Sequence, residues 1–288
     1  IVVSKATNFI SQKTNTKVSI KKLFITFTGD VNLEGLYLED TKGDTLIYSK
    51  SLRVEIPLVP IIMGNPISID GLKWTGLRAN VVRKDTLEGY NFQFLIDAFA
   101  SDKPKEVDTT TSEPPKISIG SIDFSDFKVN FNDEVTGMKA NLNLGEFHFK
   151  GKNFDLKKMD FEVAKLSLEN TTATYIQSKP SPPSDSTESA LPYLALKNLT
   201  LKNVVVHYES VPDSLVADLN VANLELRDAK ADLRKQDIQL DKFALSNSNI
   251  QLKLKGNKNI DAKPVENTTD PKDIQPFIWP EWNVNVSS

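Results

Sequence analysis

The chain has 288 residues, of which 39% are apolar and 25% charged, with 35 basic against 38 acidic side chains. A formal net charge of −3 excludes the basic excess that a nucleic-acid-binding surface needs, so we expect no nucleic-acid partner. The chain has no cysteine, which excludes disulfides, thiolate metal sites and cysteine nucleophiles. Its two histidines, His148 and His207, leave little for acid–base catalysis or metal binding. We therefore expect no enzyme, no cofactor and no metal.

The N-terminal residues predict a short helix near 1–13, because apolar residues there recur on one helical face. Strand-like segments follow at 17–28, 31–39, 44–56 and 67–84, and glycine-containing turns separate them.

A second short helix is expected near 91–100. Asn91 is a candidate N-cap, and the helix would carry Phe92, Leu95, Ile96 and Phe99 as a lid or docking element.

Three stretches lose apolar character and fill with Ser, Thr, Pro and charged residues: 101–114, 178–191 and 256–279. Such segments bury too little apolar surface to order themselves and are typical of linkers. A proline and an alternating apolar run follow each of them. This predicts an N-terminal helix with a first β segment (1–100), β repeat A (115–177), β repeat B (192–255) and the start of a further repeat (280–288).

An internal repeat appears when the sequence is shifted by 77 residues. Ile117, Ile119 and Ile122 then fall on Leu194, Leu196 and Leu199, and Asp155-Leu-Lys-Lys158 falls on Asp232-Leu-Arg-Lys235. The correspondence holds without a gap from 115 to about 175.

The apolar residues inside each repeat alternate with period 2, which predicts strands with one apolar and one polar face. The alternation slips by one residue at 119–121, near Asp126, at 145–146 and at 164–165. Each slip indicates either a bulge or a tight turn between strands. Repeated bulges bend a sheet, so the sequence predicts a mainly β fold: a repetitive, curved, amphipathic sheet that forms an elongated groove. About 16 strand segments spaced about 4.8 Å apart would give a groove of roughly 75 Å.

The order of segments in the first hundred residues resembles the N-terminal region of the TamB family, within the AsmA-like superfamily. The segments that carry this resemblance are the opening helix, Thr16-Lys-Val-Ser-Ile-Lys-Lys-Leu23, Val31-Asn-Leu-Glu-Gly-Leu-Tyr-Leu-Glu-Asp40, Gly43-Asp-Thr-Leu-Ile-Tyr-Ser49, Ile67-Ser-Ile-Asp-Gly-Leu72 and Asn91-Phe-Gln-Phe94. The two repeats fit the body of the same family.

The resemblance implies a periplasmic protein of a Gram-negative bacterium that carries phospholipids between the inner and outer membranes along a β-groove. It also implies an inner-membrane anchor before this region, and a later C-terminal domain that meets an outer-membrane barrel protein. No run of about 18 apolar residues occurs, so we expect no membrane span within this sequence. Because the chain starts at Ile1 and Trp282-Asn-Val-Asn-Val286 stops within a strand-like alternation, we expect it to be part of a longer protein. The alternative role that the resemblance implies is assistance in outer-membrane protein assembly or translocation.

Residues on the apolar faces of the repeats are the candidates for lining a lipid groove, through contact with phospholipid acyl chains. In repeat A they are Ile117, Ile119, Ile122, Phe124, Val129, Phe131, Leu142, Leu144, Phe147, Phe149, Phe161, Val163, Leu166 and Leu168, and in repeat B they are Leu194, Leu196, Leu199, Leu201, Val206, Leu219, Val221, Leu224, Leu226, Ile238, Leu240, Phe243 and Leu245.

Purely structural interpretations of the same residues remain open. The apolar faces also fit a closed sandwich or barrel core, which would make the chain a structural spacer. Both histidines alternate with apolar neighbours and are expected on the polar face, exposed to solvent. The acidic pairs Asp123/Asp126 and Asp133/Glu134 match no catalytic arrangement, and we expect them to serve solubility.

Overall fold

The computed structural model describes residues 2–57, 69–100, 119–155, 158–180, 191–254 and 283–286. Most of the three expected linkers therefore lies outside the described residues. The helices are α1 (Val2–Thr14) and α3 (Gln93–Phe99). The strands are β1 (Val18–Ser19), β2 (Lys22–Ile25), β3 (Val31–Glu39), β4 (Thr45–Glu55), β5 (Ile69–Arg83), β6 (Ile119–Asp133), β7 (Met138–Asp155), β8 (Asp160–Gln177), β9 (Tyr193–Ser210), β10 (Leu215–Asp232), β11 (Asp237–Leu240), β12 (Lys242–Ser246), β13 (Asn249–Leu254) and β14 (Asn283–Val286).

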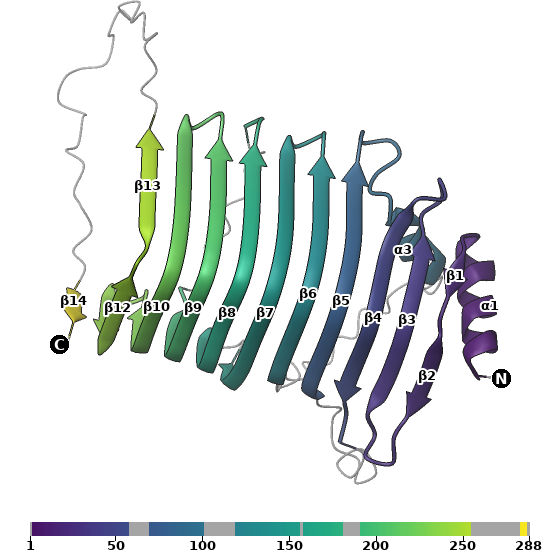
Figure 1. Cartoon of the computed structure of the whole chain (residues 1–288), viewed down its shortest axis with the longest axis horizontal. Helices are drawn as coiled ribbons and strands as arrows, with labels where there is room; N and C mark the ends of the chain where they lie inside the picture. Colours follow the sequence, from purple (N-terminus) through teal and green to yellow (C-terminus); the bar gives the residue numbers. More distant parts are fainter. Residues whose placement is uncertain are drawn as a thin grey trace, which may run out of the picture.

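These strands form one curved sheet that does not close on itself (Figure 1). Its order is β1-β3-β4-β5-β6-β7-β8-β9-β10-β11-β14, with β2 also paired to β3, and β12 and β13 also paired to β10. Neighbours are antiparallel within three-strand groups, whereas β5–β6, β8–β9 and β11–β14 are parallel. The expected mainly β, curved sheet is confirmed.

Every long strand departs from regular pairing at the same level of the sheet. Asp126 of β6 faces Gly145 of β7, and Asn170 of β8 faces Asn203 of β9. Neither pair forms the ladder hydrogen bonds of a regular sheet, but the residues before and after each pair keep the same register. Asp126, Asn170 and Asn203 adopt positive φ angles of 52–56°, a region in which Asn and Asp are enriched. We call this row of positions the bend line.

The bend line reverses the alternation of side chains without breaking the register. Phe124 and Phe127 are three residues apart and would face opposite sides of a regular strand. Here their rings stack with centroids 4.9 Å apart, because the extra residue at Asp126 returns Phe127 to the face of Phe124. The phase slip predicted near Asp126 is thus an extra residue inside a continuous strand and not a turn.

Glycine occupies several positions of the bend line where a side chain would not fit or where φ is positive. A Cβ at Gly145 would lie 2.6 Å from two carbonyl oxygens of β8, and Gly76 of β5 has a φ of +69°. The line continues to Gly35 of β3, and also separates β12 from β13, because Asn247 lies between them with a φ of 51°. A second, weaker line of unbridged positions crosses the lower part of the strands at Ala164–Lys165 and Asp228.

The 77-residue repeat is present in the backbone. Residues with positive φ recur at this spacing in four pairs, which are Asp126 and Asn203, Gly137 and Ser214, Met159 and Gln236, and Asn170 and Asn247. Each three-strand group therefore repeats its bends and turns as well as its apolar pattern.

The expected length was too great. About 16 strand segments were expected, but several phase slips lie inside single strands, and the sheet path through the described residues contains eleven strands. At about 4.8 Å per neighbour these span about 50 Å.

The two helices lie at the N-terminal end of the sheet (Figure 1). Ile10 of α1, with Phe92 and residues of α3, packs on a small cluster of Val18, Leu38 and Leu46. The expected N-cap role of Asn91 is wrong, because Phe92 occupies the cap position and no side chain caps the helix. The Asn91 side chain instead bonds the backbone of Asn80 and Val82 in β5, beside the start of β4.

We predict that Asn203→Val lowers the free energy of unfolding by about 1–2 kcal/mol, because a β-branched residue is strained at positive φ. Asn203→Gly should be close to neutral, since glycine adopts this conformation freely. Urea unfolding of the three proteins measures the difference. Equal stability of the valine variant would show that this position does not need its left-handed conformation.

Candidate functional site

One face of the sheet carries continuous rows of apolar side chains that run across the strands. The register aligns Leu23, Leu33, Leu52, Trp74, Phe124, Phe147, Leu168, Leu201, Leu224 and Leu245 in one row. A second row is Val18, Leu38, Ile47, Ala79, Val129, Leu142, Ala173, Val206, Leu219 and Ile250. We call this side of the sheet the apolar face.

A buried row lies between these two rows, along the bend line. Its members are Ser49, Leu77, Phe127, Leu144, Thr171, Val204 and Val221, all 8% exposed or less. They are buried because the strand segments on both sides of the bend turn their side chains over them. The apolar face is therefore the concave one, and this row is its floor.

The residues beside the floor are not covered in the same way. Only eight apolar side chains in the described part of the chain are buried, and all of them belong to the floor or to the helix-covered N-terminal corner. Most of the others on this face are half-buried, and Leu194 is 42% exposed. A closed sandwich would bury both rows against a second sheet, and this sheet remains open.

Aromatic rings concentrate at the middle of the apolar face. Trp74 meets Phe124 and Phe127 edge-on at centroid distances of 6.2 and 5.5 Å, and Phe124 stacks on Phe147 at 5.7 Å. The indole N–H of Trp74 donates to Oγ of the buried Ser49 at 2.8 Å. The polar atom of the largest side chain is thus satisfied, and the ring presents only apolar surface.

The register places the described candidate lining residues on the apolar face. Ile117 lies outside the described residues, and Ile119 is in β6 but its side chain is not described. Phe161 lies beyond the second line of unbridged positions and faces Phe154 on the neighbouring strand. The ring of Phe154 lies 5.9 Å from that of Phe149. This contact shows that the lower segments share the same face.

Sequence reasoning missed two groups of residues on this face. Phe127 and Val204, on the floor, were not among the predicted lining residues. The second group comes from the N-terminal strands, including Leu52, Leu72 and Trp74. Their alternation was visible in the sequence, but the 77-residue repeat does not extend to them, so nothing aligned them with the later strands.

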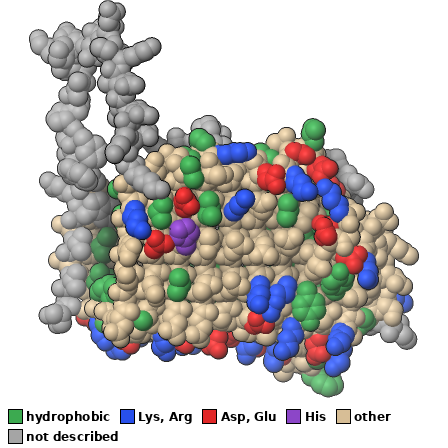
Figure 2. All heavy atoms as spheres, turned by 45° about the horizontal axis from the view of Figure 1, so that its top comes forward, with side chains coloured by type: hydrophobic (Ala, Val, Ile, Leu, Met, Phe, Trp, Pro, Cys, Tyr) green, Lys and Arg blue, Asp and Glu red, His purple; other side chains and the backbone are tan. Residues whose placement is uncertain are grey.

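The opposite face carries the charged side chains, and Figure 2 shows Lys, Arg, Asp, Glu and a histidine spread over it, with separate apolar side chains between them. The Nδ1 atoms of His148 and His207 each lie 2.7 Å from an aspartate, Asp123 and Asp218. Both histidines are thus on the polar face as expected, each bonded to a carboxylate on the neighbouring strand. The residues that the structure describes contain no cluster of His, Asp and Glu suited to a metal ion.

The expectation that the acidic pairs serve solubility is wrong for Asp133, which is 1% exposed. Its carboxylate accepts hydrogen bonds from Arg83, from the hydroxyl of Tyr90 at 3.0 Å and from the hydroxyl of Thr136 at 2.8 Å. The Arg83 guanidinium, with help from Thr136 and Tyr90, holds the pKa of Asp133 well below its ordinary value, although burial opposes this shift. Asp133 thereby fastens the end of β6 to β5 and to the segment that leads into α3.

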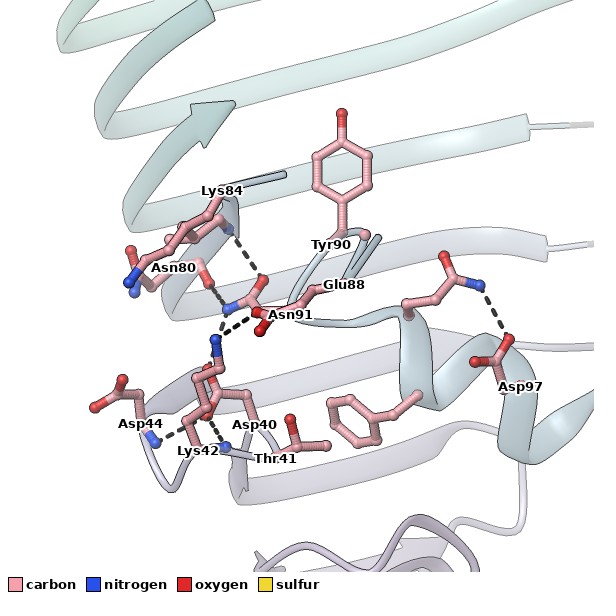
Figure 3. A pocket seen from close by; sticks show the side chains of 14 residues that line it. Asp40, Thr41, Lys42, Asp44, Asn80, Lys84, Glu88, Tyr90, Asn91 and Asp97 are labelled. Carbon is pink, nitrogen blue, oxygen red and sulfur yellow. Dashed lines mark hydrogen bonds and ion pairs between the residues drawn. The ribbon is translucent and has the colours of Figure 1, made fainter. Parts of the chain in front are cut away.

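A cavity of about 450 Å³, lined mostly by polar and charged residues, lies beside Tyr90, between the β3–β4 turn and the start of α3 (Figure 3). Lys42 pairs with Glu88 at 2.6 Å, and the Asn91 side chain bonds the backbone of Asn80 and Val82. These contacts pair the polar groups of Lys42, Glu88 and Asn91 with one another or with the backbone. They connect the β3–β4 turn to the segment before α3.

No protein-family model matches the chain, and no curated protein matches its sequence. Within the described residues, no helix combines the length and the apolar character needed to cross a membrane.

We predict that Asp133→Asn lowers the urea midpoint at pH 7. The pKa of Asp133 is lowered on folding, so its stabilising effect is present above the ordinary value of 3.8 and is lost as the pH falls below it. The difference in urea midpoint between the variant and the wild-type protein should therefore become smaller between pH 5 and pH 3.

Asp126→Asn is the matched control, because Asp126 makes an exposed ion pair with Arg78 and asparagine also tolerates its positive φ. We expect little change in its midpoint at either pH. A gap for Asp133→Asn that stays constant with pH would contradict the assigned ionisation.

Proposed function

We propose that the concave apolar face binds the acyl chains of phospholipids and carries them along the sheet. The observation that supports this is the set of apolar rows, which cross ten successive strands at right angles to the strand direction while the sheet stays open. Such rows present similar apolar side chains on every strand, so an acyl chain could move from one strand to the next without meeting a polar barrier. The proposed activity is non-enzymatic.

The energy balance favours such a path. Exposing an acyl chain to water costs about 0.8 kcal/mol per methylene, or roughly 10 kcal/mol for a chain of ordinary length. Half-buried Leu, Ile, Val and Phe side chains remove much of this penalty at every position along the face. A lipid would keep its polar headgroup at the open side, in water, while its tail lies over the floor.

The sequence resemblance to the TamB family supports the same proposal. We propose on this basis that the chain works in the periplasm of a Gram-negative bacterium, tethered to the inner membrane, in a bridge to an outer-membrane barrel protein. The rival occupant of the apolar face is an unfolded outer-membrane protein, which would make the chain an assembly factor.

Photo-crosslinking tests the occupant. Phe124 and Phe147 face each other on the apolar face, and the next pair, Ser125 and Glu146, faces the other side. With benzoylphenylalanine at each site in living cells, we expect phospholipid-mass adducts at the two phenylalanine sites and not at the other two. Adducts with polypeptide alone would favour the assembly role, and no adducts from an incorporated probe would overturn both.

A charge placed on the apolar face should impede binding. We predict that Leu201→Asp weakens the binding of a fluorescent phospholipid analogue at least about tenfold, because an unpaired carboxylate would be desolvated by the acyl chain. Val205→Asp is the matched control, since Val205 lies on the same strand, is 42% exposed and faces the polar side. Equal loss of binding in both variants, with unchanged circular dichroism, would contradict the proposed site.

A further inference from the structure

The short strand β14 repeats a pairing made earlier in the sheet. Asp237 to Leu240 of β11 pair in parallel with Asn283 to Val286. Asp160 to Val163, which lie 77 residues before β11, pair in parallel with Tyr193 to Leu196 at the start of β9.

The hydrogen bonds at the two junctions also correspond. The N–H of Tyr193 donates to the carbonyl of Met159 at 2.9 Å, and the N–H of Asn283 donates to the carbonyl of Gln236, also at 2.9 Å. Met159 and Gln236 are 77 residues apart, and both have positive φ. β14 therefore lies on β11 as the first four residues of β9 lie on β8.

The strands that follow β11 lack the partner that β8 has. Among the described residues, β12 and β13 have one strand neighbour, β10. Phe243, Ile250, Leu252 and Leu254 are 52–71% exposed on this edge. The residues 77 positions earlier, which are Leu166, Ala173, Tyr175 and Gln177, are half-buried or buried beside β9.

We propose that the edge formed by β12 and β13 pairs in parallel with a further amphipathic strand that lies in line with β14. Its expected chemistry is that of β9: apolar residues on alternate positions, with Asn, Asp or Gly at the position that faces Asn247. Such a strand would cover the exposed apolar side chains and extend the apolar rows by one strand. This inference does not depend on what the apolar face binds.

The register of this pairing follows from the repeat. Glu169 faces Lys202 and Thr172 faces Val205 in the β8–β9 pair. A strand with the β9 sequence should therefore place the position of Lys202 opposite Ser246, and that of Val205 opposite Asn249. Because the chain has no cysteine, single cysteines can report this register without background.

The experiment uses the full chain carrying Ser246→Cys or Asn249→Cys and a synthetic peptide of residues 193–210. The peptide carries cysteine in place of either Lys202 or Val205. Facing residues on paired strands lie within disulfide reach, whereas a shift of three residues places them about 11 Å apart. We expect the two matched combinations to form mixed disulfides at least about tenfold faster than the two mismatched ones.

Each other outcome would overturn the proposal. Preference for the two mismatched combinations would indicate antiparallel pairing, and equal rates in all four would indicate no defined register. Disulfide-linked dimers of Ser246→Cys that form faster than the peptide adduct would assign the edge to a second copy of the chain. A peptide of the same composition in shuffled order controls for adhesion to exposed apolar surface, and it should not react above the mismatched rate.

Discussion

The structure depends on one backbone constraint: each long strand carries an extra residue at the same level of the sheet. The strands bend together because the irregularity lies in both partners of each pair, and the register continues past it. Left-handed conformations at Gly76, Asp126, Asn170 and Asn203 supply the extra residue in four of the six long strands β5 to β10. A bend in a single strand would break its ladder, whereas a shared bend turns the whole sheet into a trough.

The bend also decides which residues stabilise the fold. It buries a floor that includes Phe127, Leu144 and Val204 on one face, without a second sheet above them. Much of the remaining stability then comes from the hydrogen-bonded ladders between long strands and from buried ion pairs such as Asp133 with Arg83. In most globular proteins a larger apolar core has this role. This division leaves the rows beside the floor open to an apolar ligand, which is what the proposed transport of lipid needs.

Much of this organisation could be predicted from the sequence, because alternation and phase slips are local. The slips near Asp126 and at 145–146 mark the bend line, and the 77-residue shift aligns its positions in the two repeats. The buried fastening at Asp133 could not be predicted, because its partners Arg83 and Tyr90 are about fifty residues away across a parallel junction. The role of Asn91 was missed for a related reason: it bonds the last part of β5 beyond the point where the pairing with β4 begins, and that register is not visible in the sequence.

The proposed function requires that the open concave face holds lipid. Native mass spectrometry of the chain, purified without detergent and incubated with phospholipid vesicles, measures this most directly. We expect complexes with whole numbers of phospholipid molecules for the wild-type protein, and few or none when the face carries a charge. A spectrum that contains only the bare polypeptide at every lipid concentration would contradict it.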